Sequence, residues 1–173
     1  MKTINNIALA IRRSMKRRNL TVTVKNTCKH LNKITEKHFA SPNSNPLLIC
    51  VEGNTLSGKT WAIKFFLTKM KAHSSLYINT FSSDFLMPRL STFEPENTPD
   101  ILVIDEATHA SSKELKKFFA QPPSSWTGIV ILVAQKFSDL PQALTNNSDT
   151  FPNLFVLNTN SKDALPKYLN IKN

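Results

Sequence analysis

One stretch constrains the fold more than any other: an apolar run that ends at a glycine and leads into a Gly-Lys-Thr triplet. The run covers residues 47–52, Gly53 follows it, and Gly58-Lys59-Thr60 comes after four further residues. The spacing G-x-x-x-x-G-K-[ST], with a strand before it and a helix after it, is typical of a loop whose backbone N–H groups surround a phosphate. The chain has only three glycines, and two of them are in this stretch. The pattern predicts a phosphate-binding loop.

The residue types in this loop predict a division of roles. The backbone N–H groups hold the β- and γ-phosphates at the start of a helix, where the helix dipole favours negative charge. Lys59 adds a positive charge beside the phosphates, and the hydroxyl of Thr60 completes the coordination of Mg²⁺. The residues expected to contact the nucleotide are Gly53, Asn54, Thr55, Leu56, Ser57, Gly58, Lys59, Thr60 and Trp61.

A second motif is the apolar run at residues 101–104, which ends in the carboxylate pair Asp105-Glu106. Asp105 at the end of a strand can hold Mg²⁺ through water, because this ion keeps several of its waters. Glu106 is then placed to polarise the attacking water as a general base. An Asp-Glu pair can also serve only to stabilise a helix start. The two motifs, about 45 residues apart, together favour a shared catalytic site.

The rest of the pattern alternates strands with helices, which predicts an α/β fold with a parallel sheet and right-handed crossovers. Five strands are expected, at 47–52, 75–79, 101–104, 129–133 and 154–157. The helices between them are expected near 59–72, 111–120 and 140–144. Residues 47–158 therefore form the predicted core, and residues 159–173 are expected to be a polar tail.

With both motifs in place, residues 47–158 resemble the P-loop NTPase superfamily, in its branch with an additional strand and a catalytic glutamate. That branch includes AAA+, RecA-like and helicase proteins. The assignment rests on Asp105 lying on the third predicted strand and on Glu106 after it. The resemblance implies a three-layer core with a five-stranded, mainly parallel sheet that binds ATP and Mg²⁺ and hydrolyses ATP.

The resemblance also implies a fourth strand between the two motif strands, ending in a polar residue that senses the γ-phosphate. Gln135 is the matching position, although a polar loop residue without a role is the alternative. Members of this branch commonly use an arginine finger after the fourth strand, and this chain has no arginine after Arg89. Arg89, an N-terminal arginine of a neighbouring chain, Lys136 or a partner protein must then replace it. Slow hydrolysis by the isolated protein is expected.

Positive charge is concentrated at the N-terminus. The chain has a formal net charge of +10, and residues 1–40 hold ten Lys/Arg against one acidic residue. An amphipathic helix is predicted at 3–18 and a second at about 25–39, followed by a linker of turn-forming residues at 41–46. A basic arm of this kind suggests a polyanionic partner. The nucleic-acid candidates are Arg12, Arg13, Lys16, Arg17, Arg18, Lys25, Lys29, Lys33 and Lys37. A solvated basic face and a membrane-surface helix are the alternatives.

These features favour a minimal ATPase that acts with nucleic acid, with DNA preferred, in the manner of mobile-element DNA processing, packaging, segregation or transfer. A homo-oligomer or a partner protein is expected to complete the site. Two alternatives remain: a small-molecule kinase, and a nucleotide-dependent adaptor at a membrane surface. Two cysteines without metal-type spacing and no long apolar stretch lead us to expect a cytoplasmic protein.

Overall fold

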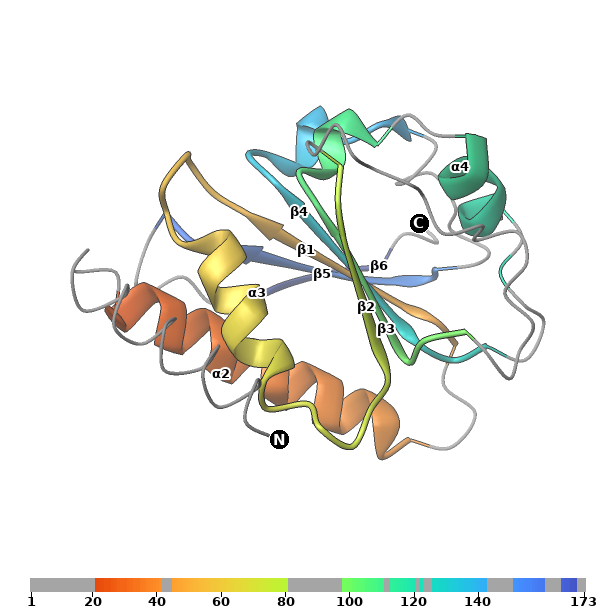
Figure 1. The fold of residues 1–173 in the computed structure, drawn as a ribbon, viewed down its shortest axis with the longest axis horizontal. Coiled ribbons are helices and arrows are strands. Elements are labelled where there is room, and N and C mark those ends of the chain that lie inside the picture. The colour runs from red at the N-terminus through yellow and green to blue at the C-terminus, as the bar shows by residue number, and fades with distance from the viewer. Residues whose placement is uncertain are drawn as a thin grey trace.

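A six-stranded, mostly parallel β-sheet organises the molecule, and helices cover both of its faces (Figure 1). The computed structural model describes residues 21–41, 45–80, 98–110, 113–120, 122, 126–142, 151–160 and 166–170. The helix predicted at 3–18 and the segment that contains Arg89 lie outside these ranges.

The order of the strands across the sheet is β2-β3-β4-β1-β5-β6. Their bounds are β1 (Leu47–Glu52), β2 (Ser75–Asn79), β3 (Ile101–Asp105), β4 (Ile129–Ala134), β5 (Asn153–Asn158) and β6 (Lys167–Asn170). The first five strands are parallel, and β6 pairs antiparallel with β5. The expectation that the fourth strand lies between the two motif strands, β1 and β3, is confirmed.

The prediction of only five strands was wrong, because β6 lies within the segment expected to be a polar tail. β6 is four residues long and joins the sheet through backbone pairing with β5. Backbone pairing needs no apolar run, so the sequence of this strand carries little signal. Its Tyr168 ring packs on Phe155 of β5, with the ring centroids 5.0 Å apart.

The helices are placed on opposite sides of the sheet. On one face lie α2 (Thr21–Phe39) and α3 (Lys59–Leu67), which pack against each other. On the other side lie α4 (Lys113–Ala120) and two 3₁₀ turns, η3 (Ala107–His109) and η4 (Phe137–Asp139) (Figure 1). The helix expected near 140–144 extends into residues outside the described ranges.

Two predicted helix boundaries were wrong. Helix α2 begins at Thr21 and not near Lys25, although its first four residues are β-branched and disfavour a helix. Val24 is buried and packs with Ala62 of α3, so tertiary contacts override the local preference. Helix α3 ends at Leu67 and not at residue 72; there the hydroxyl of Thr68 donates to the carbonyl of Phe65 at 2.7 Å.

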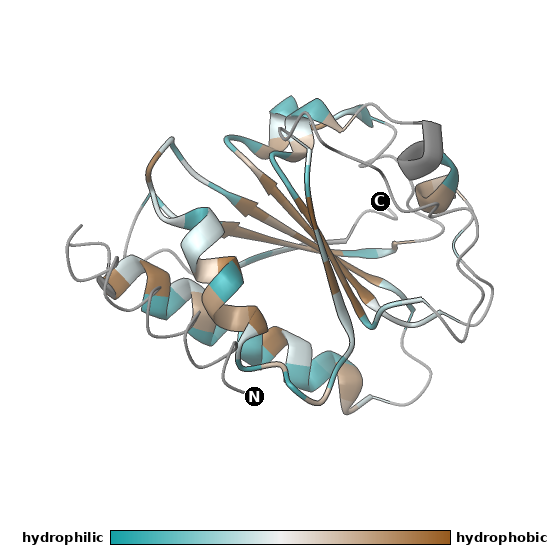
Figure 2. Cartoon of the chain, in the orientation of Figure 1, coloured by the Kyte–Doolittle hydropathy of each residue, from teal (hydrophilic) through white to brown (hydrophobic). Residues whose placement is uncertain are grey.

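Alternate residues of the central strands belong to two separate hydrophobic cores, one on each face of the sheet. Leu48 and Cys50 of β1 face the α4 side, whereas Ile49 and Val51 face the side of α2 and α3. β3 and β4 are buried along their whole length. The central strands of the sheet are mostly coloured as hydrophobic in Figure 2. Such strands are typical of the centre of a parallel sheet covered on both faces.

Helix α2 belongs to the same folded unit as the sheet. Cys28 and Leu31 of α2 are buried in the core on its side of the sheet. His38, near the end of α2, is only 9% exposed, and its Nε2 lies 2.6 Å from the carbonyl oxygen of Thr127. The pairing arises because the end of α2 meets the loop that leads into β4.

None of the helices in the described ranges combines the length and the apolar character needed to cross a membrane.

Candidate functional site

The loop at residues 53–58 joins β1 to α3 at the edge of the sheet where the parallel strands end. Gly53 is required there by close approach: a Cβ on this residue would lie 2.0 Å from the hydroxyl oxygen of Thr159. Gly58 has φ 92°, a left-handed conformation that glycine adopts without strain. The two glycines of the motif are thus explained by the packing and the backbone of the loop.

The first turn of α3 leaves its N–H groups available to an anion. Among the described residues, no side chain caps this helix, whose N-cap residue is Gly58. The hydroxyl of Ser57, which could serve as a cap, instead lies 2.6 Å from the hydroxyl of Thr159. Uncapped N–H groups and the positive end of the helix dipole together favour a phosphate at this place.

The side chain of Lys59, the first residue of α3, reaches back into the loop. Its buried Nζ donates to the carbonyl oxygens of Gly53 at 2.7 Å and Asn54 at 3.0 Å. Burial lowers the pKa of Lys59, and the nearby carboxylates of Glu106 and Asp105 partly offset this effect. An anion in the loop would stabilise the charged ammonium, because it would compensate for the loss of water.

Asp105, at the end of β3, links the two sequence motifs. Its carboxylate is 1% exposed, and its Oδ2 accepts a hydrogen bond from the Thr60 hydroxyl at 2.9 Å. The hydroxyl of Tyr77 on β2 donates to the same oxygen, and the N–H of Glu106 donates to Oδ1 at 3.0 Å. Burial, followed by the contact with Asp105, raises the pKa of Tyr77.

Glu106 adopts a backbone conformation that is uncommon for its residue type. Its φ is 57°, in the left-handed region. The Thr80 hydroxyl lies 2.5 Å from the carbonyl oxygen of Glu106 and 3.1 Å from that of Asp105, and both contacts hold this turn in place. Backbone strain of this kind persists where surrounding contacts enforce it, and it is concentrated at functional sites.

Most of the predicted catalytic and nucleotide-binding residues line one cavity, which has a volume of about 210 Å³. It is lined by Thr55, Leu56, Gly58, Lys59, Thr60, Trp61, Glu106 and Gln135. The carbonyl of Gln135 also accepts a hydrogen bond from the N–H of Gly53 at 3.0 Å. Sites for drug-sized ligands start at about 300 Å³. The cavity can therefore enclose the phosphate end of a larger ligand while the rest lies on the surface.

The arrangement provides oxygen ligands for a hard cation. Within the described ranges, no group of three or more His, Cys, Asp or Glu side chains could hold a metal ion. Mg²⁺ does not need such a group, since it binds through one or two protein oxygens, several waters and the phosphates of a substrate. The adjoining oxygens of Thr60 and Asp105 fit that requirement.

Sequence reasoning missed a layer of polar residues that supports the loop. Asn160 Oδ1 accepts from the N–H of Asn54 at 2.6 Å, and Thr159 contacts Ser57. Glu52 accepts from the N–H of Phe137 and from the side-chain amide of Asn158, both at 2.9 Å. A signal was present: polar residues follow β5, and the ends of parallel strands meet at one edge of the sheet.

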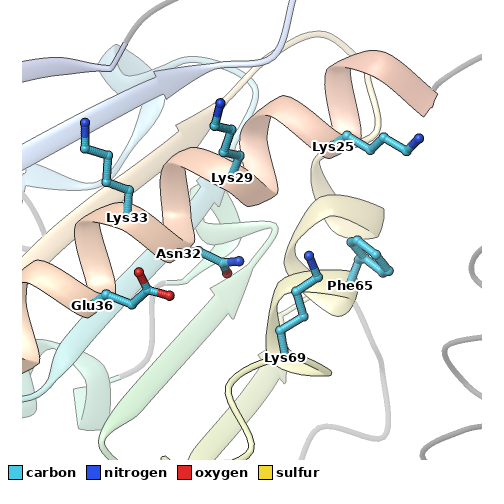
Figure 3. A pocket seen from close by; sticks show the side chains of 7 residues that line it. All are labelled: Lys25, Lys29, Asn32, Lys33, Glu36, Phe65 and Lys69. Carbon is cyan, nitrogen blue, oxygen red and sulfur yellow. The ribbon is translucent and has the colours of Figure 1, made fainter.

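Four of the predicted nucleic-acid residues lie together on α2. Lys25, Lys29 and Lys33 line a cleft of about 410 Å³ between α2 and α3, together with Lys69 of the turn after α3 (Figure 3). Lys37 lies one turn further along the helix. The remaining candidates are outside the described residues: Arg12, Arg13, Lys16, Arg17, Arg18 and the proposed finger Arg89.

A comparison with models of known protein families gives no match for this chain, and a comparison with curated proteins gives none either. Its function is therefore argued from the site.

Proposed function

We propose that the chain is a Mg²⁺-dependent ATPase of the P-loop type, in the branch with an additional strand and a catalytic glutamate. One observation carries the proposal: the Thr60 hydroxyl donates to the Asp105 carboxylate at 2.9 Å. This bond joins two motifs that are 45 residues apart in the sequence, beside the cavity that Lys59 and Glu106 line. The position of β4 between β1 and β3 supports the choice of branch.

In this proposal the loop and the start of α3 bind the phosphates of ATP through backbone N–H groups. Lys59 exchanges the carbonyls of Gly53 and Asn54 for phosphate oxygens. Thr60 and, through water, Asp105 would hold Mg²⁺, which would neutralise charge at the phosphates. Gln135, on the cavity wall, is placed to contact the γ-phosphate.

Glu106 carries the chemical step. Its carboxylate accepts a proton from the attacking water as the water oxygen bonds to the γ-phosphorus. The bond between that phosphorus and the bridging oxygen breaks, which gives ADP and inorganic phosphate. The turn fixed by Thr80 keeps the Glu106 side chain on the cavity.

The isolated protein is expected to hydrolyse ATP slowly. The described part of the chain contains no arginine that could stabilise the transition state, and Lys136, the nearest candidate after β4, is exposed. An arginine finger contributes about 10³–10⁵ in rate. Arg89, an arginine at 12–18 of a neighbouring copy, or Lys136 would take its place, or a partner protein would supply a finger of its own.

Two substitutions test the proposal, and they should have opposite effects on ATP binding. Lys59→Ala should abolish ATP binding, because it removes the positive charge that reaches into the loop. Glu106→Gln should bind ATP and Mg²⁺ normally and lose hydrolysis by about a hundredfold or more. Binding is measured by calorimetry and hydrolysis by phosphate release.

Lys71→Ala, which removes an exposed lysine in the turn after α3, is the matched control and should behave as the wild type. A Lys59→Ala protein that binds ATP as well as the control does would contradict the proposal. Transfer of the phosphate to a small molecule, with no release into water, would favour the kinase alternative.

Nucleic acid, DNA in particular, is the proposed partner of this ATPase. The support is the concentration of positive charge on α2, which favours a polyanion through neutralisation of phosphates. The proposed role is DNA processing, packaging, segregation or transfer in a mobile element. Binding to anionic membranes in place of nucleic acid would favour the membrane-surface alternative.

A further inference from the structure

The lysines of α2 form a track that turns around the helix. Lys25, Lys29, Lys33 and Lys37 follow one another at intervals of four residues, and each interval advances the track by about 40° because a helical turn takes about 3.6 residues. We call these four residues the basic track. Lys25, Lys29 and Lys33 line the cleft between α2 and α3. Lys33 also lines a second groove, together with Lys37, between α2 and the strands β5 and β6.

This second groove has a volume of about 750 Å³ and combines cations with aromatic rings. It is lined by His30, Lys33, Ile34, Lys37, His38, Ser41, Leu47, Asn153, Phe155, Pro166 and Tyr168. No acidic side chain is among these described residues, although the neighbouring cleft contains Glu36. Among the described residues that line it, the groove therefore presents positive charge to its occupant without a compensating carboxylate.

Tyr168 gives the groove an anchored aromatic surface. Its side chain is on the edge strand β6 and is 52% exposed. The Tyr168 ring packs on Phe155 at 5.0 Å between centroids, and its hydroxyl donates to the Asn153 side chain. A ring held from one side and exposed on the other loses little freedom when a planar group stacks on it.

The lysines of the basic track repel one another, and this repulsion also favours binding of an anion. Like charges four residues apart destabilise a helix. Burial lowers the pKa of His30, and the positive charges of Lys29 and Lys33 lower it further. The charges of Lys29 and Lys33 thus disfavour protonation of His30. A bound polyanion would relieve this repulsion.

We infer that the groove between α2 and the β5–β6 edge binds single-stranded nucleic acid. An unpaired base stacks on Tyr168, while Lys33 and Lys37 contact the phosphates beside it and the basic track leads the strand toward α3. The inference deepens the proposed function, since it rests on nucleic acid being the partner and names its form. Duplex bases are already stacked on each other, so they cannot offer a face to Tyr168.

The test measures binding of fluorescent probes to the full chain at low and moderate salt. The probes are oligothymidylate, oligouridylate and a duplex, each of about 15 nucleotides or base pairs. We expect single strands to bind more tightly than the duplex. Tyr168→Ala should weaken single-strand binding by about tenfold to a hundredfold, the loss of one stacked base, and leave duplex binding unchanged. The two single strands distinguish DNA from RNA.

Matched variants distinguish the contribution of base stacking to binding from that of positive charge. Tyr168→Phe keeps the ring and should bind single strands within about threefold of the wild type. Lys33→Glu should weaken binding of every probe and reduce its dependence on salt. Lys117→Glu makes the same charge change on α4, away from the groove, and should have a much smaller effect. Unchanged single-strand binding by Tyr168→Ala, or equal losses for Tyr168→Ala and Tyr168→Phe, would overturn the inference.

Further measurements distinguish a failure of this inference from a failure of the proposed ATPase function. ATP binding by Tyr168→Ala should match that of the wild type, because the groove contains none of the cavity residues around Lys59. A wild type that binds ATP but shows no single-strand binding refutes the groove alone. Binding to phosphatidylserine vesicles without any binding to single strands would also refute it. A wild type that binds single strands through Tyr168 but not ATP refutes the proposed function alone.

Discussion

Two hydroxyl groups converge on one oxygen of the Asp105 carboxylate, and they come from different elements. Thr60 is in the first turn of α3, whereas Tyr77 is on strand β2 beside β3. A buried carboxylate needs such donors, since burial without hydrogen bonds would disfavour its charged form. Tyr77 is therefore a structural support for the proposed metal ligand.

Tyr77→Phe should lower the free energy of unfolding by about 1–3 kcal/mol, because it removes a hydrogen bond to a buried charged group. Tyr168→Phe is the matched control: it also removes a Tyr hydroxyl that donates to a side chain, but at an exposed site, and should cost less than about 1 kcal/mol. Urea denaturation measures both. Equal losses for the two variants would contradict the role assigned to Tyr77.

Because the pKa of Tyr77 is raised, the free energy of unfolding should also depend on pH. The unfolded chain releases the Tyr proton near pH 10, whereas the folded protein retains it to higher pH because of burial and the contact with Asp105. The contribution of this group is fully present below pH 10 and is lost as the pH rises above it. The wild type should lose stability more steeply than Tyr77→Phe between about pH 10 and 11.

At the level of elements, sequence patterns predicted the buried parts of the fold best. Strands β1, β2, β3 and β4 were placed to within one residue at each end, because apolar runs beside turn residues are specific. β6 was missed because backbone pairing holds it in the sheet. The start of α2 was missed because Val24 is stabilised by contacts with α3 that no local pattern records.

The same limit applies to the site. The glycines, Lys59, Thr60, Asp105 and Glu106 follow from motifs whose spacing reflects local backbone geometry. The supporting residues Asn158, Thr159 and Asn160 come from the far end of the chain. They reach the loop only because β5 lies beside β1 in the sheet. Strand order is a tertiary property, so the sequence alone did not place them.

Helix α2 offers a prediction at this scale. Leu31→Ala should reduce the free energy of unfolding by about 2–5 kcal/mol, because its side chain is 0% exposed in the core that the sheet, α2 and α3 share. Val22→Ala, at a residue 56% exposed on the same helix, is the control and should cost less than about 1 kcal/mol. A small effect of Leu31→Ala would show that α2 is an arm independent of the core.

For the whole molecule, the arrangement of the two proposed sites suggests how they communicate. Helix α2 carries the basic track on its surface and packs against α3, whose first residues Lys59 and Thr60 line the cavity proposed to hold the phosphates. Nucleic acid on α2 and a nucleotide at α3 would therefore both stabilise the same pair of helices. Such coupling is reciprocal: each ligand should tighten the binding of the other by the same factor.

The proposed need for a basic residue from a neighbouring chain can be tested by mixing two inactive variants. Glu106→Gln lacks the general base but keeps every arginine, whereas Arg89→Ala keeps Glu106 but lacks one proposed finger. If Arg89 acts across an interface, a mixture with single-stranded nucleic acid forms sites with Glu106 from one chain and Arg89 from the other. ATP hydrolysis should then rise well above that of either variant alone.

The size of the recovery distinguishes the sources of the finger. Random mixing in equal amounts should restore up to about a quarter of the activity of the wild type, since a productive site needs one specific pair of chains. The matched mixture of Glu106→Gln with Lys136→Ala tests the other candidate in the same way. An Arg89→Ala protein that is fully active alone would exclude Arg89. If neither mixture recovers, although Arg89→Ala and Lys136→Ala are each inactive alone, the residue acts within its own chain, because a finger from the same chain cannot be restored by a neighbour.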